Sequence, residues 1–319
     1  MSRPLEGKFG IVTGGSRGTH PSPNITPCIQ SSMDTKKAGI GEAIAHNLAS
    51  KGCSLLLNYT SSTSAARTGS LCQSLASQHA ITCYAVQADL SDPQPATSTI
   101  LTAAKEHFTK PNGTFQIDIL VNNAGVSQDR FLNDPEKGPI EPGYFNWQYT
   151  INVLAPLLLT QAAAPYMPVN AARSARIVNI SSVSSSLGFT GQSVYGGTKA
   201  ALESMTRTWA RELAGRATVN AINPGPVIGD MYFQTGEAFW RQMQGFQDGT
   251  PLSAVLEGDE KMEGELTGKQ RELIRDKMGG RRPAFTSEVA GVVGMLCTGD
   301  GGWCTGSVVC ANGGMRMGI

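Results

Sequence analysis

A tyrosine and a lysine four residues apart form the first pair of side chains able to do chemistry, Tyr195 and Lys199 in SVYGGTK. Residues at this spacing share one face of a helix. A phenol has a solution pKa of about 10, and a nearby ammonium group favours the phenolate and lowers that pKa. The pair therefore predicts proton exchange with an alcohol or carbonyl oxygen. An isolated pair of this kind is also typical of a solvent-exposed amphipathic helix.

Further polar residues strengthen the catalytic interpretation. Ser182 ends the apolar segment RIVNISS, where its hydroxyl can donate a hydrogen bond to an oxygen that gains negative charge. Asn152 lies within the helical pattern YTINVLAP, and an amide inside a helix is mildly unfavourable, which indicates a specific hydrogen-bonding task.

A glycine-rich turn follows the first apolar segment as TGGSRG (13–18), and GIGEAIA (39–45) resumes as a helix. Glycines let the backbone approach a pyrophosphate, and a helix N-terminus supplies N–H groups and a partial positive charge. Between these halves lie residues 19–38, which include three prolines and show no amphipathic period.

Short apolar segments alternate with longer amphipathic ones, which predicts a parallel sheet with helices on both faces. The predicted strands are 8–14, 53–59, 82–89, 116–125, 175–182, 217–225 and 306–313, and the predicted helices are 40–50, 63–78, 96–108, 144–166, 193–214 and 286–297. The pattern is typical of one α/β domain over residues 1–319, a Rossmann-type doubly wound sheet of seven parallel strands. Residues 229–283 follow the sixth strand, at the edge where such sheets bind ligands, and are predicted to form a substrate lid.

Composition excludes several classes of function. The 319 residues carry a formal net charge of +1 and no basic stripe, so nucleic acid is not an expected partner. No apolar segment reaches the length of a membrane span or resembles a signal peptide, which predicts a cytoplasmic protein. Seven cysteines without a CxxC pair indicate free thiols, and four histidines without ligand spacing predict no metal site.

Together these motifs resemble the short-chain dehydrogenase/reductase family. The resemblance rests on the divided glycine turn, NNAG (122–125), Asn152, Ser182 with Tyr195 and Lys199, and NPGPV (223–227). It spans the chain apart from 19–38 and parts of 229–283, and is strongest towards the 3-oxoacyl-[acyl-carrier-protein] reductases and hydroxynaphthalene reductases. One departure is Gly229, where the family often has a threonine that touches the carboxamide of the cofactor.

The resemblance implies NADP-dependent reduction of a ketone, of the 3-oxoacyl or polyketide type, to a secondary alcohol. Tyr195 is implied as the general acid, and Lys199 as the residue that lowers the pKa of Tyr195 and holds the nicotinamide ribose. Ser182 is implied to polarise the carbonyl, and Asn152 to hold a water that links Lys199 to solvent. Besides Tyr195 and Lys199, the implied cofactor-binding residues are Gly14, Ser16, Arg17, Gly18, Ile40, Gly41, Asn58, Tyr59, Thr60, Ser61, Asp89, Leu90, Asn123, Ala124, Gly125, Pro224, Gly225 and Val227.

NADP(H) is favoured over NAD because the second strand ends in Asn58, Tyr59, Thr60 and Ser61, with no carboxylate to bind a ribose 2′-hydroxyl or repel a 2′-phosphate. Arg17 in the glycine turn is a candidate to pair with that phosphate.

The expected partners are a small carbonyl substrate, either free or bound to a carrier protein, and further copies of the chain. Family resemblance implies a homotetramer or homodimer through helices 144–166 and 193–214. Aromatic residues favour an apolar or aromatic substrate, although they equally suit the core of the lid or a subunit interface. They are Phe145, Trp147, Tyr232, Phe233, Phe239 and Trp240.

Two hypotheses explain the insertion, since removal of 19–39 rejoins the family pattern. The first is a translated intron, which fits in phase if Gly18 is encoded GGT and Ala38 GCA, and any other codon at either position rules out this splice. Otherwise it is a surface loop, which the slow growth of loop-closure entropy with length tolerates. The insertion also leaves an alternative function open, a non-redox binding or assembly subunit on the same scaffold.

Overall fold

The computed structural model describes residues 3–15, 39–169, 173–229, 232–233, 236–256 and 258–318. Its centre is a seven-stranded sheet with the strand order β3-β2-β1-β4-β7-β8-β9, and every pairing in it is parallel. The strands are β1 (Phe9–Val12), β2 (Ser54–Tyr59), β3 (Cys83–Gln87), β4 (Ile119–Asn122), β7 (Ala175–Ile180), β8 (Ala217–Ile222) and β9 (Val308–Val309). The predicted α/β fold with seven parallel strands is confirmed.

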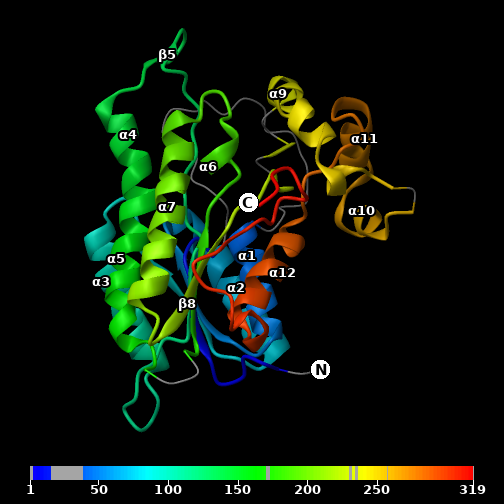
Figure 1. Ribbon diagram of the computed structural model, residues 1–319. Helices are drawn as coiled ribbons and strands as arrows, with labels where there is room; N and C mark the ends of the chain where they lie inside the picture. Colours follow the sequence, from blue (N-terminus) through cyan, green and yellow to red (C-terminus); the bar gives the residue numbers. More distant parts are fainter. Residues whose placement is uncertain are drawn as a thin grey trace.

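Helices cover the sheet on both faces, as continuous apolar strands require. One face carries α1 (Ile40–Ser50), α2 (Ala65–His79) and α12 (Thr286–Cys297), and the other carries α3 (Pro93–Phe108), α5 (Ala155–Ala163) and α7 (Ser193–Glu212) (Figure 1).

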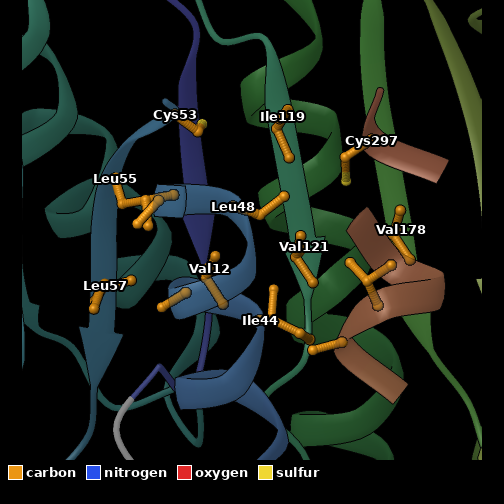
Figure 2. Packing of buried hydrophobic residues seen from close by; sticks show 14 of the residues in the cluster. Val12, Ile44, Leu48, Cys53, Leu55, Leu57, Ile119, Val121, Val178 and Cys297 are labelled. Carbon is orange, nitrogen blue, oxygen red and sulfur yellow. The ribbon is translucent and has the colours of Figure 1, made fainter. Parts of the chain in front are cut away.

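The core beneath α1 and α12 shows why the strands are buried throughout. Ile44 and Leu48 of α1 point onto Val12 and Val121 of the sheet, and all four side chains are fully buried (Figure 2). Burying a side chain of this size stabilises the fold by roughly 1.5–3 kcal/mol. This packing fixes the start of α1 beside the end of β1, where the glycine turn must close.

The predicted helix 144–166 is divided in the structure. It begins as α4 (Pro142–Tyr149), widens into a π-helical turn at Thr150–Leu154, and continues as α5 before a short 3₁₀ turn at Ala164–Tyr166. Single π turns inside α-helices are frequent at functional sites, and this one contains Asn152.

A helical segment follows β8 where the lid was predicted. It comprises α9 (Glu237–Asp248), a 3₁₀ turn at Pro251–Ser253, α10 (Glu260–Glu265) and α11 (Gly268–Lys277), and lies to one side of the sheet (Figure 1). Its own core centres on Trp240, Met262, Ile274 and Phe285. We call this segment with its core the lid, which packs against the body through α9. Phe246 of α9 meets Phe189 edge-on, with ring centroids 4.7 Å apart.

Smaller elements were not predicted. A short antiparallel pair, β5 (Asn133–Asp134) with β6 (Gly138–Pro139), lies between β4 and α4, and α6 (Ser184–Leu187) follows β7. In the part of the chain that the structure describes, no helix is long and apolar enough to cross a membrane.

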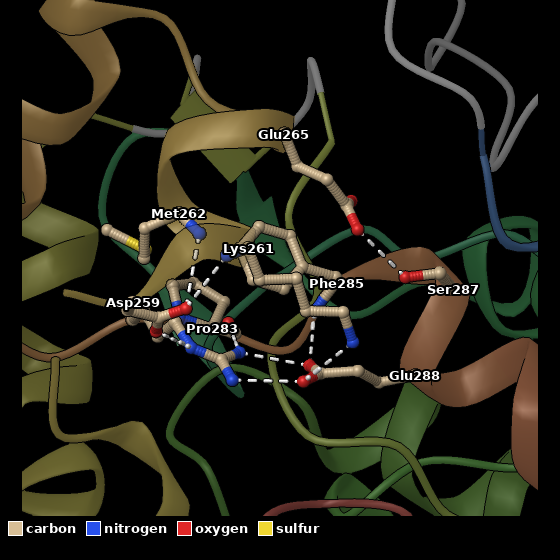
Figure 3. A network of polar contacts seen from close by, with 9 residues as sticks. Asp259, Lys261, Met262, Glu265, Pro283, Phe285, Ser287 and Glu288 are labelled. Atoms are coloured by element: carbon tan, nitrogen blue, oxygen red, sulfur yellow. Dashed lines mark hydrogen bonds and ion pairs between the residues drawn. The ribbon is translucent and has the colours of Figure 1, made fainter. Parts of the chain in front are cut away.

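Glu288 joins the lid to the first turn of α12. Its carboxylate accepts hydrogen bonds from the Phe285 backbone N–H at 2.8 Å and from both terminal nitrogens of Arg282 at 2.9 Å (Figure 3). Arg282 also lies 3.8 Å from Asp259, which caps α10. Burial raises the pKa of Glu288, but the bonds from Arg282 and Phe285 more than offset this and hold the pKa below its usual value.

We predict that Glu288→Ala loosens the lid without unfolding the sheet. Two charge-assisted hydrogen bonds from Arg282 and one helix cap are lost together, which should lower the stability of the lid by about 2 kcal/mol. Hydrogen exchange should accelerate in α10 and α11 and stay unchanged in β1, β4 and β7. Glu260→Ala, an exposed carboxylate of α10, is the matched control. Equal exchange in both variants would show that Glu288 does not anchor the lid.

Candidate active site

The two halves of the glycine turn lie together in space. A Cβ atom on Gly41 would collide with the carbonyl oxygen of Gly14, so only glycine fits there. Asn123, which follows β4, donates through its amide to the carbonyl oxygens of Thr13 at 2.9 Å and Gly14 at 3.1 Å. The Thr13 hydroxyl accepts from the backbone N–H groups of Asn123 and Ala124 at 3.0 Å. The described part of the turn therefore packs closely against α1 and the residues after β4, and close backbone packing is a feature that pyrophosphate binding requires.

Three predicted cofactor residues, Ser16, Arg17 and Gly18, lie outside the described residues, as does the inserted segment 19–38. Gly39 caps α1 in an extended conformation, and α1 begins at Ile40. The contact between Gly14 and Gly41 keeps the first part of the turn and the start of α1 together, as a surface loop between them requires. It equally suits the chain without the insertion, so both hypotheses stay open.

Asn58 at the end of β2 is buried and binds backbone on three segments. Its amide donates to the carbonyl oxygens of Tyr59 at 3.3 Å and Ala88 at 2.9 Å, and its oxygen accepts from the N–H of Gly14 at 3.4 Å. Asn58 thus holds the start of the glycine turn against the ends of β2 and β3. The residues left partly exposed at this edge are Tyr59, Thr60 and Ser61.

The remaining predicted cofactor residues lie at the carboxyl ends of their strands. Asp89 is exposed and caps the turn after β3 by accepting from the N–H of Ser91, whereas Leu90 is buried. Pro224 accepts from the N–H of Val183, and Val227 pairs with Ala284 beside the lid. A Cβ on Gly225 would lie 3.4 Å from the Cβ of Asn312.

Lys199 is buried, with 4 % of its surface exposed, and donates to the carbonyl oxygen of Ile180 at 2.9 Å. Burial lowers its pKa to about 8, and the charge of Glu203, one turn further along α7, offsets part of that fall. A Cβ on Gly125 would lie 3.3 Å from the Lys199 nitrogen and 3.2 Å from the Asn152 oxygen. Because Gly125 has no side chain, the ammonium group of Lys199 can lie close to the backbone of the NNAG segment.

The predicted lowering of the Tyr195 pKa by Lys199 stays a prediction, because other influences set this pKa in the chain alone. Burial raises the pKa of Tyr195 to about 12, a hydrogen bond with Ser182 lowers it in part, and the charge of Asp129 raises it further. The Lys199 nitrogen lies 5.7 Å from the centre of the Tyr195 ring and donates to Ile180, so burial of the phenol dominates. The phenol is therefore fully protonated at neutral pH, which is the state that a proton donor needs.

Asn152 is held rigidly in the π turn. Its side chain makes a reciprocal pair with the backbone of Val126, both bonds being 2.8 Å, and its amide donates to the Thr198 hydroxyl at 3.1 Å. The side chain links α7 to the strand end that precedes Val126. Its predicted water-holding role stays a prediction.

Ser182 lies in a chain of polar side chains. Its hydroxyl donates to Ser184 at 3.0 Å, and the Ser184 hydroxyl donates to the amide oxygen of Gln192 at 2.7 Å. The Gln192 side chain hydrogen-bonds the carboxylate of Asp129. Because Ser182 also bonds Tyr195, this chain reaches from the phenol to Asp129.

Several of these residues were missed from the sequence, namely Thr13, Asp129, Gln192, Thr198 and Glu203. Thr198 had a signal, since it precedes Lys199 on the same helix. Glu203 had one as well, a carboxylate at the next i+4 position after Lys199. Its oxygen accepts from Ser181 at 2.6 Å and Ser185 at 2.8 Å. Asp129 and Gln192 carry no spacing signal.

The strand ends therefore bring a buried ammonium group, a protonated phenol and a serine hydroxyl to one edge, beside a glycine turn. A family model described as short chain dehydrogenase matches residues 35–238. The chain belongs to the short-chain dehydrogenase/reductase family. This reductase is an oxidoreductase that acts on CH–OH groups. The predicted family and enzyme class are therefore confirmed. In the part of the chain that the structure describes, no cluster of His, Cys, Asp or Glu is placed to hold a metal ion.

Two relatives and one solved structure resemble the reductase over nearly its whole length. It is 70% identical over 318 residues to the L-xylulose reductase of Aspergillus niger, covering 99% of this chain and 100% of the relative. It is 52% identical to the L-xylo-3-hexulose reductase of Hypocrea jecorina, covering 100% of both chains. A blue fluorescent protein from a metagenomic library, solved in complex with NADPH, superposes with a TM-score of 0.72 at 28% identity, covering 98% of this chain and 100% of that protein.

We predict that Lys199→Met removes a pH dependence of stability. The folded pKa of about 8 lies below the ordinary 10.5, so the unfolded chain binds more protons between these values. The free energy of unfolding of the reductase should therefore gain about 2–3 kcal/mol from this group as the pH rises from 8 to 10.5. Denaturant titrations should show this gain in the parent and in the exposed-site control Lys110→Met, and not in Lys199→Met. An unchanged gain in Lys199→Met would contradict the buried, weakened charge.

Proposed function

We propose that the reductase converts the keto group of a polyhydroxylated sugar ketone into a secondary alcohol, with NADPH as the reductant. The observation that carries the proposal is the 70% identity, over 99% of the chain, to a protein named L-xylulose reductase. The relative at 52% identity is also named as the reductase of a ketose.

The glycine turn and the strand ends fit a dinucleotide cofactor. Only glycine is tolerated at Gly41 against Gly14, which leaves the backbone free to face a pyrophosphate. NADP(H) is the favoured cofactor, since Tyr59, Thr60 and Ser61 place no carboxylate at the exposed edge of β2. When bound, the reduced nicotinamide supplies the hydride.

The side chains of the reductase then perform the proton chemistry. Tyr195 donates the phenolic proton to the carbonyl oxygen as negative charge develops there, and Ser182 donates a hydrogen bond to the same oxygen. Lys199, a cation below its pKa of about 8, stabilises the phenolate that Tyr195 becomes. Asn152 keeps α7 and the segment after β4 in register for this exchange.

The expectation of an apolar polyketide substrate is not supported by the lid aromatics. Tyr232 and Trp240 are buried in the core of the lid, with 7 % and 4 % of their surface exposed, and Phe233 and Phe239 pack against that core. Phe145 stacks on Tyr149 within α4. The side chains hydrogen-bonded to Ser182 directly or through one neighbour, Ser184 and Gln192, are polar, which suits a substrate rich in hydroxyl groups.

We predict that the chain oxidises NADPH in the presence of L-xylulose and that Tyr195→Phe lowers kcat by about 10³-fold, because proton donation is lost. NADPH affinity should change less than twofold. Tyr84→Phe, at an exposed tyrosine of β3, is the matched control. Near-normal turnover in Tyr195→Phe would assign the proton to another group.

The same assay tests the insertion and the non-redox alternative. Deletion of 19–39 from the parent joins the two halves of the turn. NADPH binding only after the deletion would show that the insertion disables a reductase scaffold. Binding by neither form would favour a non-redox binding or assembly subunit.

We further propose that the reductase assembles into a homodimer or homotetramer through α4, the π turn and α5. An apolar groove of about 230 Å³ lies there between Asn146, Tyr149, Thr150, Val153, Leu154 and Leu157. Leu154 is 41 % exposed at its edge. Leu154→Glu should lower the mass measured by light scattering, because a carboxylate cannot be buried unpaired at low cost. Leu132→Glu, an exposed leucine elsewhere, should leave the mass unchanged, and a parent that is already monomeric would refute the assembly.

A further inference from the structure

The turn that carries Ser182 belongs to a different segment of the chain from Tyr195 and Lys199. Ser182 follows β7, whereas Tyr195 and Lys199 lie on α7. In the proposed reaction Ser182 and Tyr195 act on one oxygen, so the turn must be held against α7 to within about 0.5 Å. The contacts between α7 and this turn therefore set the geometry of the site.

Glu203 of α7 binds the turn on both sides of Ser182. One oxygen of its carboxylate accepts hydrogen bonds from the hydroxyls of Ser181 at 2.6 Å and Ser185 at 2.8 Å. A carboxylate only accepts, so both serines must donate. The Ser185 N–H in turn donates to the carbonyl oxygen of Ser182 at 3.0 Å. Ser182 thus lies between two residues that a single side chain holds.

The helix contacts the same segment at two further positions. A Cβ on Gly196 would lie 2.6 Å from the carbonyl oxygen of Ser184, which leaves no room for a side chain. Lys199 donates to the carbonyl oxygen of Ile180 at 2.9 Å. Residues three or four apart share one face of a helix, so these positions and Glu203 form one row along α7.

The side chain of Glu203 is buried, with 7 % of its surface exposed. A buried charge is costly unless hydrogen bonds and an opposite charge compensate it. The serine hydroxyls supply the bonds, and Lys199 supplies the charge. Burial lowers the pKa of Lys199, and the charge of Glu203 offsets part of that fall. Glu203 therefore acts on the turn through its hydrogen bonds and on Lys199 through its charge.

We propose that Glu203 is a positioning residue that holds the turn against α7 and thereby places the Ser182 hydroxyl at the substrate oxygen that Tyr195 protonates. The inference rests on the proposed ketone reduction. Without the carboxylate, Ser181 and Ser185 lose the acceptor that they share, and the turn is able to move away from the helix. The loss should appear in kcat and not in the KM for NADPH.

The test measures NADPH-dependent reduction of L-xylulose by the full chain at about pH 6, where Lys199 is charged. Glu203→Ala should lower kcat about 20-fold with a KM for NADPH within about twofold of the parent. Glu203→Gln keeps an acceptor oxygen for both serines and removes the charge, so its kcat should stay within about threefold of the parent. Glu212→Ala, an exposed carboxylate at the end of α7, is the matched control and should leave kcat unchanged.

The pH profile separates the charge of Glu203 from its hydrogen bonds. The Lys199 ammonium faces the Tyr195 ring, whose centre is 5.7 Å away, and the charge of Glu203. Only the cation stabilises a phenolate, so kcat of the parent should fall as the pH rises through the Lys199 pKa of about 8. Removal of the carboxylate charge lowers that pKa further. The fall in Glu203→Gln should therefore begin at a lower pH than in the parent and in Glu212→Ala.

Double variants test the route through Ser182. Ser182→Ala should lower kcat about 100-fold, and adding Glu203→Ala should lower it by no more than about threefold, because the hydroxyl that Glu203 positions is gone. A further loss of about 20-fold on that background would overturn the proposal. Full kcat in Glu203→Ala, or equal losses in Glu203→Ala and Glu203→Gln at about pH 6, would overturn it as well.

Hydrogen exchange supplies a readout that needs no turnover. The N–H groups of residues 183–187 should exchange faster in Glu203→Ala, and at the parent rate in Glu203→Gln and Glu212→Ala. If Glu203→Ala does not fold, Ser185→Ala, which removes one of the two bonds, should accelerate the same exchange. If the parent reduces no ketone while this exchange changes, the reduction fails and the contact stands. Unchanged exchange would refute the contact even where the reduction is observed.

Discussion

A buried ammonium group organises this active site. Lys199 is almost fully excluded from solvent, and such a charge is costly unless polar groups surround it. The carbonyl oxygen of Ile180 accepts a hydrogen bond from the ammonium group of Lys199. Glu203 lies one helical turn away as a compensating charge. The end of β7 lies beneath α7. The end of this strand and the face of the helix therefore form a single polar compartment around the ammonium group.

The same compartment holds the phenol that we propose as the acid. In a poorly solvated position a phenol keeps its proton, and Tyr195 has a pKa of about 12. A fully protonated donor suits reduction, whereas oxidation of an alcohol requires the opposite state. The lysine is available to stabilise the anion that forms after the proton has left.

Much of this could be predicted from the sequence. The seven strands could be predicted because buried parallel strands are continuous apolar segments. Tyr195, Lys199 and Ser182 could be grouped because helical spacing and strand ends are local features of the sequence. The π turn at Thr150–Leu154 was missed because it is a change in backbone hydrogen bonding that leaves the apolar pattern intact. Asp129 and Gln192 were missed because their contact depends on two loops meeting. The high pKa of Tyr195 could not be predicted, because burial, which the sequence does not reveal, is its largest cause.

The contact between Gly14 and Gly41 has a consequence for the connectivity of the chain. Two backbone segments separated by more than twenty residues in sequence touch there, so the described residues on either side of 16–38 are held close together. Positions of this kind accept new termini or guest domains, because neither the sheet nor its helices must be rearranged. The folding state of a second protein joined at the glycine turn would be coupled directly to the geometry of the glycines.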